Sequence, residues 1–409
     1  MMKVIKNIGC LAQCKPDGTQ ADIHLLHKAA IVWQDDKIYW VGPQSQIPEG
    51  LAFDEELDAD NKLVLPGLID CHTHLAFGGW RQDEFEERLR GKSYLEIAER
   101  GGGIQATVQA TRNASKAELS NKCRGFLEQM GRLGVTTVEC KSGYGLSTEQ
   151  ELKLLEIYRE LGQTQPLTIV PTFLGAHIVP QEYKKNRRLY IDLLINEMLP
   201  AVCERNLARF CDIFIEDTAF STEEAREILN VAVKLGLKIK VHADQFGDNS
   251  GSLLAADLHA VSADHLEFIS DGGISCLAQN SVVGVILPIA SLYTRQKAVD
   301  ARRLIDKKLK LAVATDFNPG SAPSFDLYLA LMLACNLCGL TPAEAVKGAT
   351  IYAAEALDLS DRLGSLEPGK LADFIIIDSA DVNHWLYHFR PDTCLLAVKN
   401  GKIIYQRQE

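Results

Sequence analysis

Short apolar runs alternate with amphipathic stretches between Lys62 and Asp316. Runs of this length rich in β-branched residues predict buried strands, and helical stretches between them indicate βα units with a parallel sheet. The strands are expected at residues 63–70, 135–141, 167–174, 210–216, 237–242, 260–265, 282–287 and 309–315. Eight strands with crossovers predict an α/β fold, a (β/α)8 TIM-like barrel, rather than an open doubly wound sheet, because no G-x-G-x-x-G motif follows the first strand.

Helix start signals lie between the predicted strands. Residues 147–150 (STEQ), 221–224 (STEE) and 341–344 (TPAE) each place a hydroxyl residue three positions before an acid or amide. In this arrangement the hydroxyl caps the helix and the later side chain reaches back to the cap. The third signal also carries proline in the first helical turn.

Both chain ends carry further short strand patterns outside the barrel. Residues 30–33 and 37–41 flank Asp35-Asp36, and residues 373–377, 395–398 and 402–405 follow near the carboxyl end, the last after the Asn400-Gly401 turn. Two separated β segments predict one small β-sandwich built from both ends. We therefore expect a composite small domain of residues 1–62 plus 358–409 and a barrel of residues 63–357.

Composition narrows the function classes. Of the 409 residues 46% are hydrophobic and 24% charged, as in ordinary soluble globular proteins. The net charge of −11 repels phosphate backbones and anionic membranes, so neither nucleic acid nor membrane is expected as a partner. An odd count of 11 cysteines forbids complete pairing and indicates a reducing compartment. Without an apolar signal-peptide core or a membrane-length stretch, a cytoplasmic location is expected.

Polar residues gather where four of the predicted strands end. Active sites of such barrels lie at the carboxyl ends of the strands, so these residues are the candidates for chemistry. The strand ends read Asp70-Cys71-His72-Thr73-His74, His242-Ala243-Asp244-Gln245, Asp264-His265-Leu266-Glu267 and Thr315-Asp316-Phe317-Asn318, and His177 follows the third strand.

The pair His72 and His74 is a weak metal signal alone, because such pairs arise by chance. Strand geometry strengthens it, since residues i and i+2 point to the same face, here the barrel interior. One further histidine and one aspartate from other strand ends, His242 and Asp316, complete a set of nitrogen and oxygen donors. Three histidines and one aspartate with an open position favour a hydrolytic metal over a closed structural site.

Two of the polar residues have competing interpretations. Asp316 can relay the proton of a metal-bound water, or it can be a buried aspartate that caps a loop. His265 can orient or polarise the scissile carbonyl, or it can be a core histidine with its hydrogen bonds satisfied. Lys141, at the end of the second strand, can form a salt bridge or, less simply, be carbamylated to bridge two metals.

The remaining cysteines and histidines carry no metal or redox motif. Cys71 is expected to point outward from the barrel into packing, and the Cys335-x-x-Cys338 pair lies in an apolar helix without a second pair. We expect surface or packing roles for the histidines off the catalytic face, which are His24, His27, His259, His384 and His388.

Longer motifs resemble a known family. Residues 66–74 (PGLIDCHTH) and 364–373 (GSLEPGKLAD) resemble the amidohydrolase superfamily. Four further segments resemble the imidazolonepropionase family within it: 101–104 (GGGI), 139–145 (ECKSGYG), 172–177 (TFLGAH) and 315–320 (TDFNPG). The resemblance covers almost the whole chain.

The resemblance implies hydrolysis of the ring amide C–N bond of 4-imidazolone-5-propanoate to N-formimidoyl-L-glutamate, a step of histidine degradation. It implies one metal ion, zinc or iron, held by His72, His74, His242 and Asp316. It places substrate contacts on Arg81, Tyr144, His177, His265 and Asn318, with Arg81, Tyr144 and His177 gripping the propanoate carboxylate. The substrate is thus a small anionic heterocycle, and the family's homodimer is expected.

Gln245 departs from the pattern of related deaminases, which place a glutamate three residues after the fifth-strand histidine. An amide cannot transfer a proton at neutral pH, so Gln245 can hold the water or a ring nitrogen while proton transfer falls to Asp316 and His265. A heterocycle deaminase is the first alternative function, and release of ammonia would identify it. A non-enzymatic binding module is the second, disfavoured because every ligand position is intact.

Overall fold

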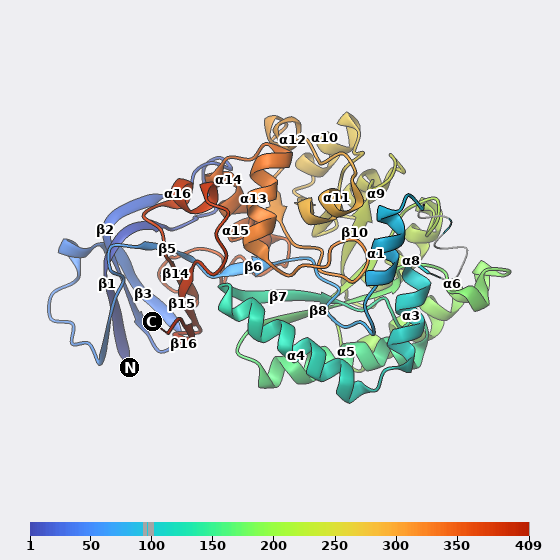
Figure 1. Ribbon diagram of the computed structural model, residues 1–409, viewed down its shortest axis with the longest axis horizontal. Helices are drawn as coiled ribbons and strands as arrows, with labels where there is room; N and C mark the ends of the chain where they lie inside the picture. Colours follow the sequence, from blue (N-terminus) through green and yellow to red (C-terminus); the bar gives the residue numbers. More distant parts are fainter. Residues whose placement is uncertain (93–95, 97–101, 409) are drawn as a thin grey trace.

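The computed structural model describes residues 1–92, 96 and 102–408, and its strands form two sheets (Figure 1). One is an eight-stranded sheet in which each neighbouring pair is parallel and the order is β13-β12-β11-β10-β9-β8-β7-β6. Its strands are β6 (Leu68–Asp70), β7 (Val135–Lys141), β8 (Thr168–Ala176), β9 (Phe210–Ile213), β10 (Lys238–Ala243), β11 (Ser262–His265), β12 (Val283–Ile286) and β13 (Leu311–Val313). Each predicted strand region overlaps one of them, which confirms the barrel.

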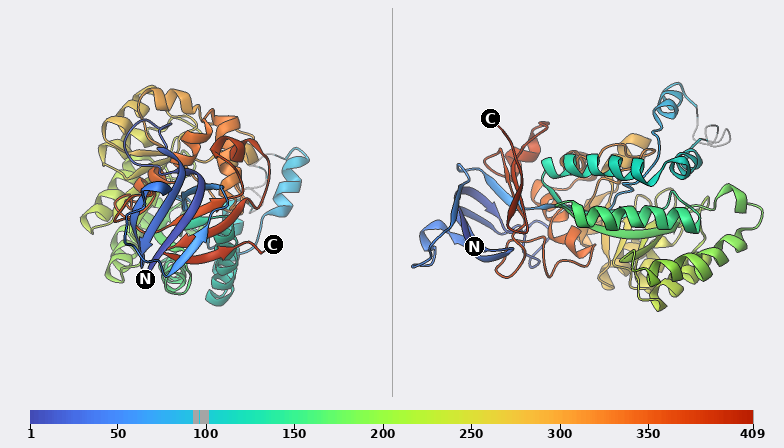
Figure 2. Two further views of the ribbon diagram at one scale, coloured as in Figure 1. Left: turned by 90° about the vertical axis from the view of Figure 1, so that its left-hand side faces the viewer. Right: turned by 90° about the horizontal axis from the view of Figure 1, so that it is seen from below.

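The second sheet is mixed and is built from both chain ends, as predicted. Its strands are β1 (Met2–Ala12), β2 (Leu25–Gln34), β3 (Lys37–Pro43), β4 (Glu55–Asp58), β5 (Leu63–Pro66), β14 (Phe374–Ile377), β15 (Cys394–Lys399) and β16 (Lys402–Gln406). Trp33 packs on Phe374 with ring centroids 5.2 Å apart and donates a hydrogen bond to Gly401 O. The sheet therefore curls over a core of its own, and both termini lie on it (Figure 2).

The predicted strand at 63–70 divides into two strands that belong to different sheets. β5 pairs with β14 and β1 of the small sheet, whereas β6 pairs with β7 of the barrel. Gly67 separates them, and a Cβ there would lie 2.4 Å from the Thr136 side chain. Glycine thus allows the chain to pass closely over β7 as it leaves one sheet for the other.

Helices cover the outside of the barrel (Figures 1 and 2). They are α1 (Gln82–Leu89), α3 (Ile104–Asn113), α4 (Lys116–Arg132), α5 (Thr148–Thr164), α6 (Arg187–Leu193), α7 (Leu199–Glu204), α8 (Thr222–Lys234), α9 (Gly251–Asp257), α10 (Asp271–Gln279), α11 (Pro288–Thr294), α12 (Ala301–Asp306), α13 (Leu327–Cys338), α14 (Pro342–Gly348), α15 (Ile351–Glu355) and α16 (Val382–Tyr387). Within the described part of the chain, no helix has the length and apolar character needed to cross a membrane.

Two of the three predicted capping boxes are present. Ser221 with Glu224 begins α8, and Thr341 with Glu344 begins α14 with proline in its first turn. The third prediction is wrong, because the Ser147 side chain makes no cap hydrogen bond although α5 begins after it. The Glu151 carboxylate instead accepts the backbone N–H groups of residues 143, 145 and 146, which fixes the loop before the helix.

The barrel closes where the chain leaves β6 and β13. Thr315 donates its backbone N–H and its hydroxyl to the buried Asp70 carboxylate, at 3.1 and 2.6 Å. Beyond the strands, Asp316 N donates to His72 O at 3.0 Å and His74 N donates to Phe317 O at 2.9 Å. These bonds set the segments after the first and last barrel strands side by side.

A loop of the small domain is anchored to the opposite end of β13. Gln20 bonds both ways with the Leu311 backbone, at 2.7 and 3.0 Å. The fully buried Lys347 ammonium of α14 donates to the carbonyl oxygens of Asp17, Thr19 and Asp22 at 2.8 to 2.9 Å. Three backbone acceptors therefore depend on one lysine.

Lys347→Met should destabilise the fold by about 2–4 kcal/mol, because three backbone carbonyl groups lose a charged donor that is itself buried. Chemical denaturation monitored by circular dichroism measures the change in the free energy of unfolding. Lys310→Met is the matched control: both ammonium groups lie 5.4 Å from the Tyr352 ring, but the Lys310 side chain is 46% exposed. The control should cost less than about 1 kcal/mol, and equal losses would contradict the anchoring role.

Candidate active site

Three histidines and one aspartate converge at the carboxyl ends of the barrel strands. One nitrogen from each of His72, His74 and His242 lies within 4.8 Å of the others. Asp316 Oδ1 lies 3.4 Å from His72 Nε2 and 3.5 Å from His74 Nε2. All four side chains are buried, so the structure brings together the whole predicted ligand set.

Two buried carboxylates determine which nitrogen faces the centre. His72 Nδ1 lies 2.6 Å from Asp264 Oδ2, and His242 Nδ1 lies 3.1 Å from Asp212 Oδ2. A carboxylate accepts the hydrogen bond, so His72 Nδ1 carries the proton and its Nε2 presents a lone pair, and the contact of His242 with Asp212 favours the same tautomer. His72 Nε2 is buried without a hydrogen-bond partner, as expected of a nitrogen whose partner is a metal ion.

Burial favours the neutral form of the histidines in this cluster. Burial, with the nearby charge of Lys141, holds the pKa of His72 well below its ordinary value, and burial beside the other histidines does the same for His74. Burial also lowers the pKa of His242, against the opposing effect of Asp212. Neutral imidazole is the form that binds metal, so these donors fit a metal site.

Asp316 and His265 occupy strained backbone at the same face, with φ of +56° and +84°. His72, His265 and Asp316 form a second group of donor atoms within 4.8 Å. Burial raises the pKa of Asp316 to about 7. Burial lowers the pKa of His265, but Glu267 and Asp316 outweigh it, so the net pKa is raised. Glu267 Oε2 lies 3.7 Å from His265 Nδ1.

Tyr144 and His177 flank the cluster on the side of His74. The His177 ring stacks on His74 with centroids 5.1 Å apart, and Tyr144 lies 5.3 Å from His177 and 5.8 Å from His74. His177 Nδ1 lies 3.0 Å from Gly143 O, so it donates its proton there and Nε2 is an acceptor. Burial lowers the pKa of His177 to about 3, which keeps the ring neutral.

Gln245 follows β10 and is 6% exposed. The loop after it is held by Glu216, which accepts hydrogen bonds from Phe246 N at 2.7 Å and Asn249 Nδ2 at 2.5 Å. Burial raises the pKa of Glu216. Gln245 thus starts a loop whose path is fixed by a carboxylate from the segment that follows β9.

Arg81 lies just before α1, and its guanidinium is already paired. Its Nε and Nη2 donate to Glu84 Oε2 at 2.9 and 2.7 Å. Its Nη1 lies close to Gly320. A Cβ atom added at this glycine would be 2.0 Å from Nη1. Glu84 Oε1 also accepts Gly103 N at 2.8 Å. Arg81 therefore reaches the loop that follows β13, but one edge of its planar group contacts an internal carboxylate.

Asn318 closes the loop after Asp316. Its Nδ2 donates to Asp316 O at 2.7 Å and Ser321 Oγ at 2.9 Å, and its Oδ1 accepts Gly320 N and Ser321 N, each at 2.8 Å. The amide that was expected to contact substrate is therefore hydrogen bonded within the loop. Of the family motif at residues 101–104, Gly101 lies outside the described residues.

Several supporting residues were not assigned from sequence. Asp212 and Glu84 were not singled out, and Asp264 and Glu267 were named only among the polar residues at a strand end, yet each of the four lies beside a predicted site residue. The spacing of Glu84, three residues after Arg81 at the start of a helix, is the one signal that could have indicated its ion pair. The prediction that Lys141 forms salt bridges is confirmed, since its Nζ lies 2.7 Å from Glu139 Oε1.

The other sequence features remain outside the site. Each of the 11 cysteines is free, including Cys335 and Cys338, and Cys71 is fully buried.

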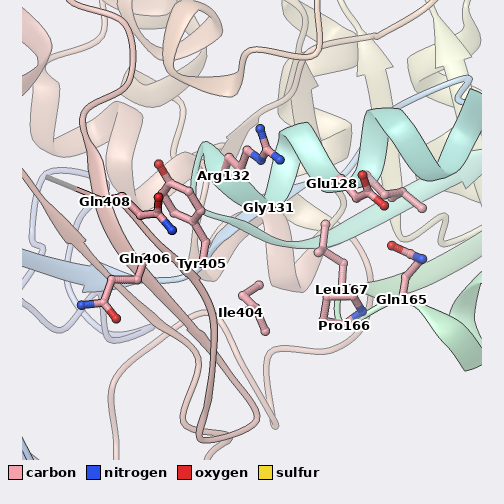
Figure 3. A pocket seen from close by; sticks show the side chains of 11 residues that line it. Glu128, Gly131, Arg132, Gln165, Pro166, Leu167, Ile404, Tyr405, Gln406 and Gln408 are labelled. Carbon is pink, nitrogen blue, oxygen red and sulfur yellow. The ribbon is translucent and has the colours of Figure 1, made fainter.

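A hollow of about 590 Å³ lies between the carboxyl end of α4, the start of β8 and β16 (Figure 3). Arg132 and Leu167 line it at the amino ends of β7 and β8, the end of the barrel opposite the histidine cluster.

Comparison with known proteins places this geometry in a family. A model described as the amidohydrolase family matches residues 63–404. The chain is 47% identical to the imidazolonepropionase of Fusobacterium nucleatum over 92% of this chain and 91% of that protein. It is 44% identical to the imidazolonepropionase of Geobacillus kaustophilus, over 94% and 92% respectively.

Solved structures share the fold at low sequence identity. An adenosine deaminase from Xanthomonas campestris with bound zinc matches with a TM-score of 0.73 at 17% identity, covering 99% of this chain and 93% of that one. The guanine deaminase of E. coli matches with a TM-score of 0.70 at 16% identity, covering 100% of each chain. The family model and the curated relatives together show that the chain belongs to the amidohydrolase family, and within it to the imidazolonepropionases.

Proposed function

We propose that the chain hydrolyses the ring amide C–N bond of 4-imidazolone-5-propanoate to N-formimidoyl-L-glutamate, a step of histidine degradation. The observation that carries this proposal is the convergence of His72, His74, His242 and Asp316 in a chain whose relatives at 44–47% identity are named imidazolonepropionase. The neutral histidines and one carboxylate suit metal-assisted hydrolysis.

One divalent ion, zinc or iron, is held by these four side chains. When bound, such an ion lowers the pKa of a water ligand to about 7 and polarises a carbonyl oxygen. The Nε2 atoms of His72 and His242 face it because Asp264 and Asp212 hold the opposite nitrogens. Their neutral charge avoids repulsion of the cation.

Proton transfer falls to Asp316 and His265. The Asp316 carboxylate takes a proton from the attacking water and passes it to the departing ring nitrogen. His265, whose pKa is raised by Glu267 against the effect of burial, donates to the developing oxyanion. Gln245 orients the water or a ring nitrogen through its amide and exchanges no proton.

The substrate carboxylate binds Arg81 and Tyr144. Glu84 occupies one edge of the Arg81 guanidinium in this structure, so the substrate either uses the remaining Nη1 or displaces Glu84. His177 presents an acceptor nitrogen, which suits a ring N–H better than the carboxylate we expected it to grip. Asn318 shapes the loop around Asp316 through its hydrogen bonds. It contacts the substrate only with the hydrogen-bonding capacity of its amide that these bonds do not use.

The oligomeric state is inferred from the family, and the cellular location from the free thiols. We propose a homodimer, as expected for the family, acting on a small anionic substrate. A cytoplasmic, reducing location is supported by the 11 free cysteines.

Protein purified without added metal should contain one equivalent of metal and convert 4-imidazolone-5-propanoate to N-formimidoyl-L-glutamate without releasing ammonia. His72→Ala should lose both metal and turnover, because a ligand is removed. Elemental analysis and product chromatography measure the two. His259→Ala, at an exposed histidine, is the control. Full metal content in His72→Ala would remove His72 from the site.

Gln245→Ala should retain some turnover, whereas Asp316→Asn should lose far more, because only the carboxylate moves a proton. Gln245→Glu should be tolerated with a changed pH profile of kcat. Steady-state rates, with the metal content of each variant measured alongside, test this division of roles. Equal losses in the Gln245→Ala and Asp316→Asn variants would contradict it.

Arg81→Ala should lower kcat/KM roughly 30-fold or more, since stranding a substrate carboxylate costs about 2–5 kcal/mol. Arg81→Lys should restore only part, because lysine lacks the planar fork. The loss should be much smaller for an imidazolone without the propanoate arm. Equal loss on both substrates would exclude Arg81 as the carboxylate anchor.

A further inference from the structure

Five charged side chains form a fully buried cluster behind the histidines, which we call the buried ion cluster. Its members are Glu139 and Lys141 of β7, Asp212 of β9, Lys240 of β10 and Asp264 of β11. Each has 0% exposure. The mechanism above uses the two aspartates to orient histidines but gives the lysines no role. A buried ammonium group is costly unless it is paired, so the placement of the lysines needs a reason.

Lys141 contacts both carboxylates that orient the histidines. Its Nζ lies 2.7 Å from Asp212 Oδ2, the atom that faces His242 Nδ1, and 3.7 Å from Asp264 Oδ2, the atom that faces His72 Nδ1. One cation therefore links the orientations of two rings, one in β10 and one just after β6. Lys141 itself is held at 2.7 Å by Glu139, which lies two residues earlier on the same face of β7.

Lys240 is equally buried but bonds differently. Its Nζ donates to Cys71 O at 2.9 Å and stays 3.5 Å from Glu139 Oε1 and 3.7 Å from Asp264 Oδ2. It therefore lies as far from Asp264 as Lys141 does, and what it lacks is the 2.7 Å contact that Lys141 makes with Asp212. The two lysines have the same burial and charge, but Lys141 donates to Asp212 and Lys240 donates to Cys71 O.

We propose that Lys141 is a positioning residue that sets the affinity of the site for its metal, by fixing Asp212 and Asp264 so that His242 and His72 present Nε2 together. This inference rests on the proposed function, since it concerns the same metal. Without the Lys141 ammonium, Asp212 loses a hydrogen bond and Asp264 loses a nearby cation, so the two carboxylates repel each other and the imidazoles are free to turn.

The direction in which metal affinity changes in a lysine variant distinguishes a positioning role from a purely electrostatic one. Removing an ammonium group near a cation site removes repulsion, so electrostatics alone predicts tighter metal binding for either lysine variant. Loss of ligand orientation predicts weaker binding, and only for Lys141. Changes in the partners that orient metal ligands typically cost 10–100-fold in affinity.

The experiment measures zinc affinity of the metal-free full chain by competition with a chromophoric chelator. Lys141→Met should weaken zinc binding about 10–100-fold, and Lys240→Met should leave it unchanged or tighter. The absorption spectrum of the cobalt-loaded protein should change in Lys141→Met and not in Lys240→Met, because only the first alters ligand geometry. Near-UV circular dichroism establishes that each variant is folded.

Losing a buried charge can prevent folding, so Lys141→Gln is measured as well, because its amide can still donate to one of the two carboxylates. It too should bind zinc more weakly than the unaltered chain. Wild-type affinity in a folded Lys141 variant, or equal weakening in Lys240→Met, overturns this inference alone. If the unaltered chain binds no zinc, cobalt or iron, the proposed function and this inference fall together.

Discussion

Closure of the barrel between its first and last strands is the constraint on which the active site depends. β6 and β13 are only three residues long, and the contact between them is completed by Thr315 on Asp70 and by backbone bonds of the segment 72–74 with 316–317. The same bonds bring two histidines and the aspartate of the cluster together. The same bonds therefore close the barrel and bring the ligand side chains together, so a change that opens the closure also separates the ligands.

Much of the fold could be predicted because its signals are local. The barrel strands are short buried segments, most of them rich in apolar or β-branched residues, and they alternate with helical stretches. The long strand β1 was missed because its alternation is broken by a bulge between Ile5 and Ile8, where Asn7 has φ of +56°. The division at Gly67 was missed because two strands of different sheets follow each other with one residue between them, so the apolar run does not end.

The site was predictable to the extent that its residues end strands. His72, His74, His242 and Asp316 could be placed by strand geometry alone, since parallel strands bring their carboxyl ends to one edge. The pairing of Arg81 with Glu84 was harder to predict, because its one sequence signal, a spacing of three residues at a helix start, does not show whether the pair forms. The buried ion cluster could not be predicted, because acids and lysines inside barrel strands are indistinguishable in sequence from exposed ones on alternate positions.

Because the small sheet joins the two chain ends, it can be completed only late in synthesis. Gln13 Nε2 donates to Leu366 O across a separation of 353 residues, and β5 pairs with β14 near the end of the chain. During synthesis the barrel strands emerge before this partner exists, so β5 waits with one edge unpaired until translation is nearly finished. A ribosome that stops short of β14 thus releases a chain with an exposed strand edge, which is a template for aggregation and a mark for quality control.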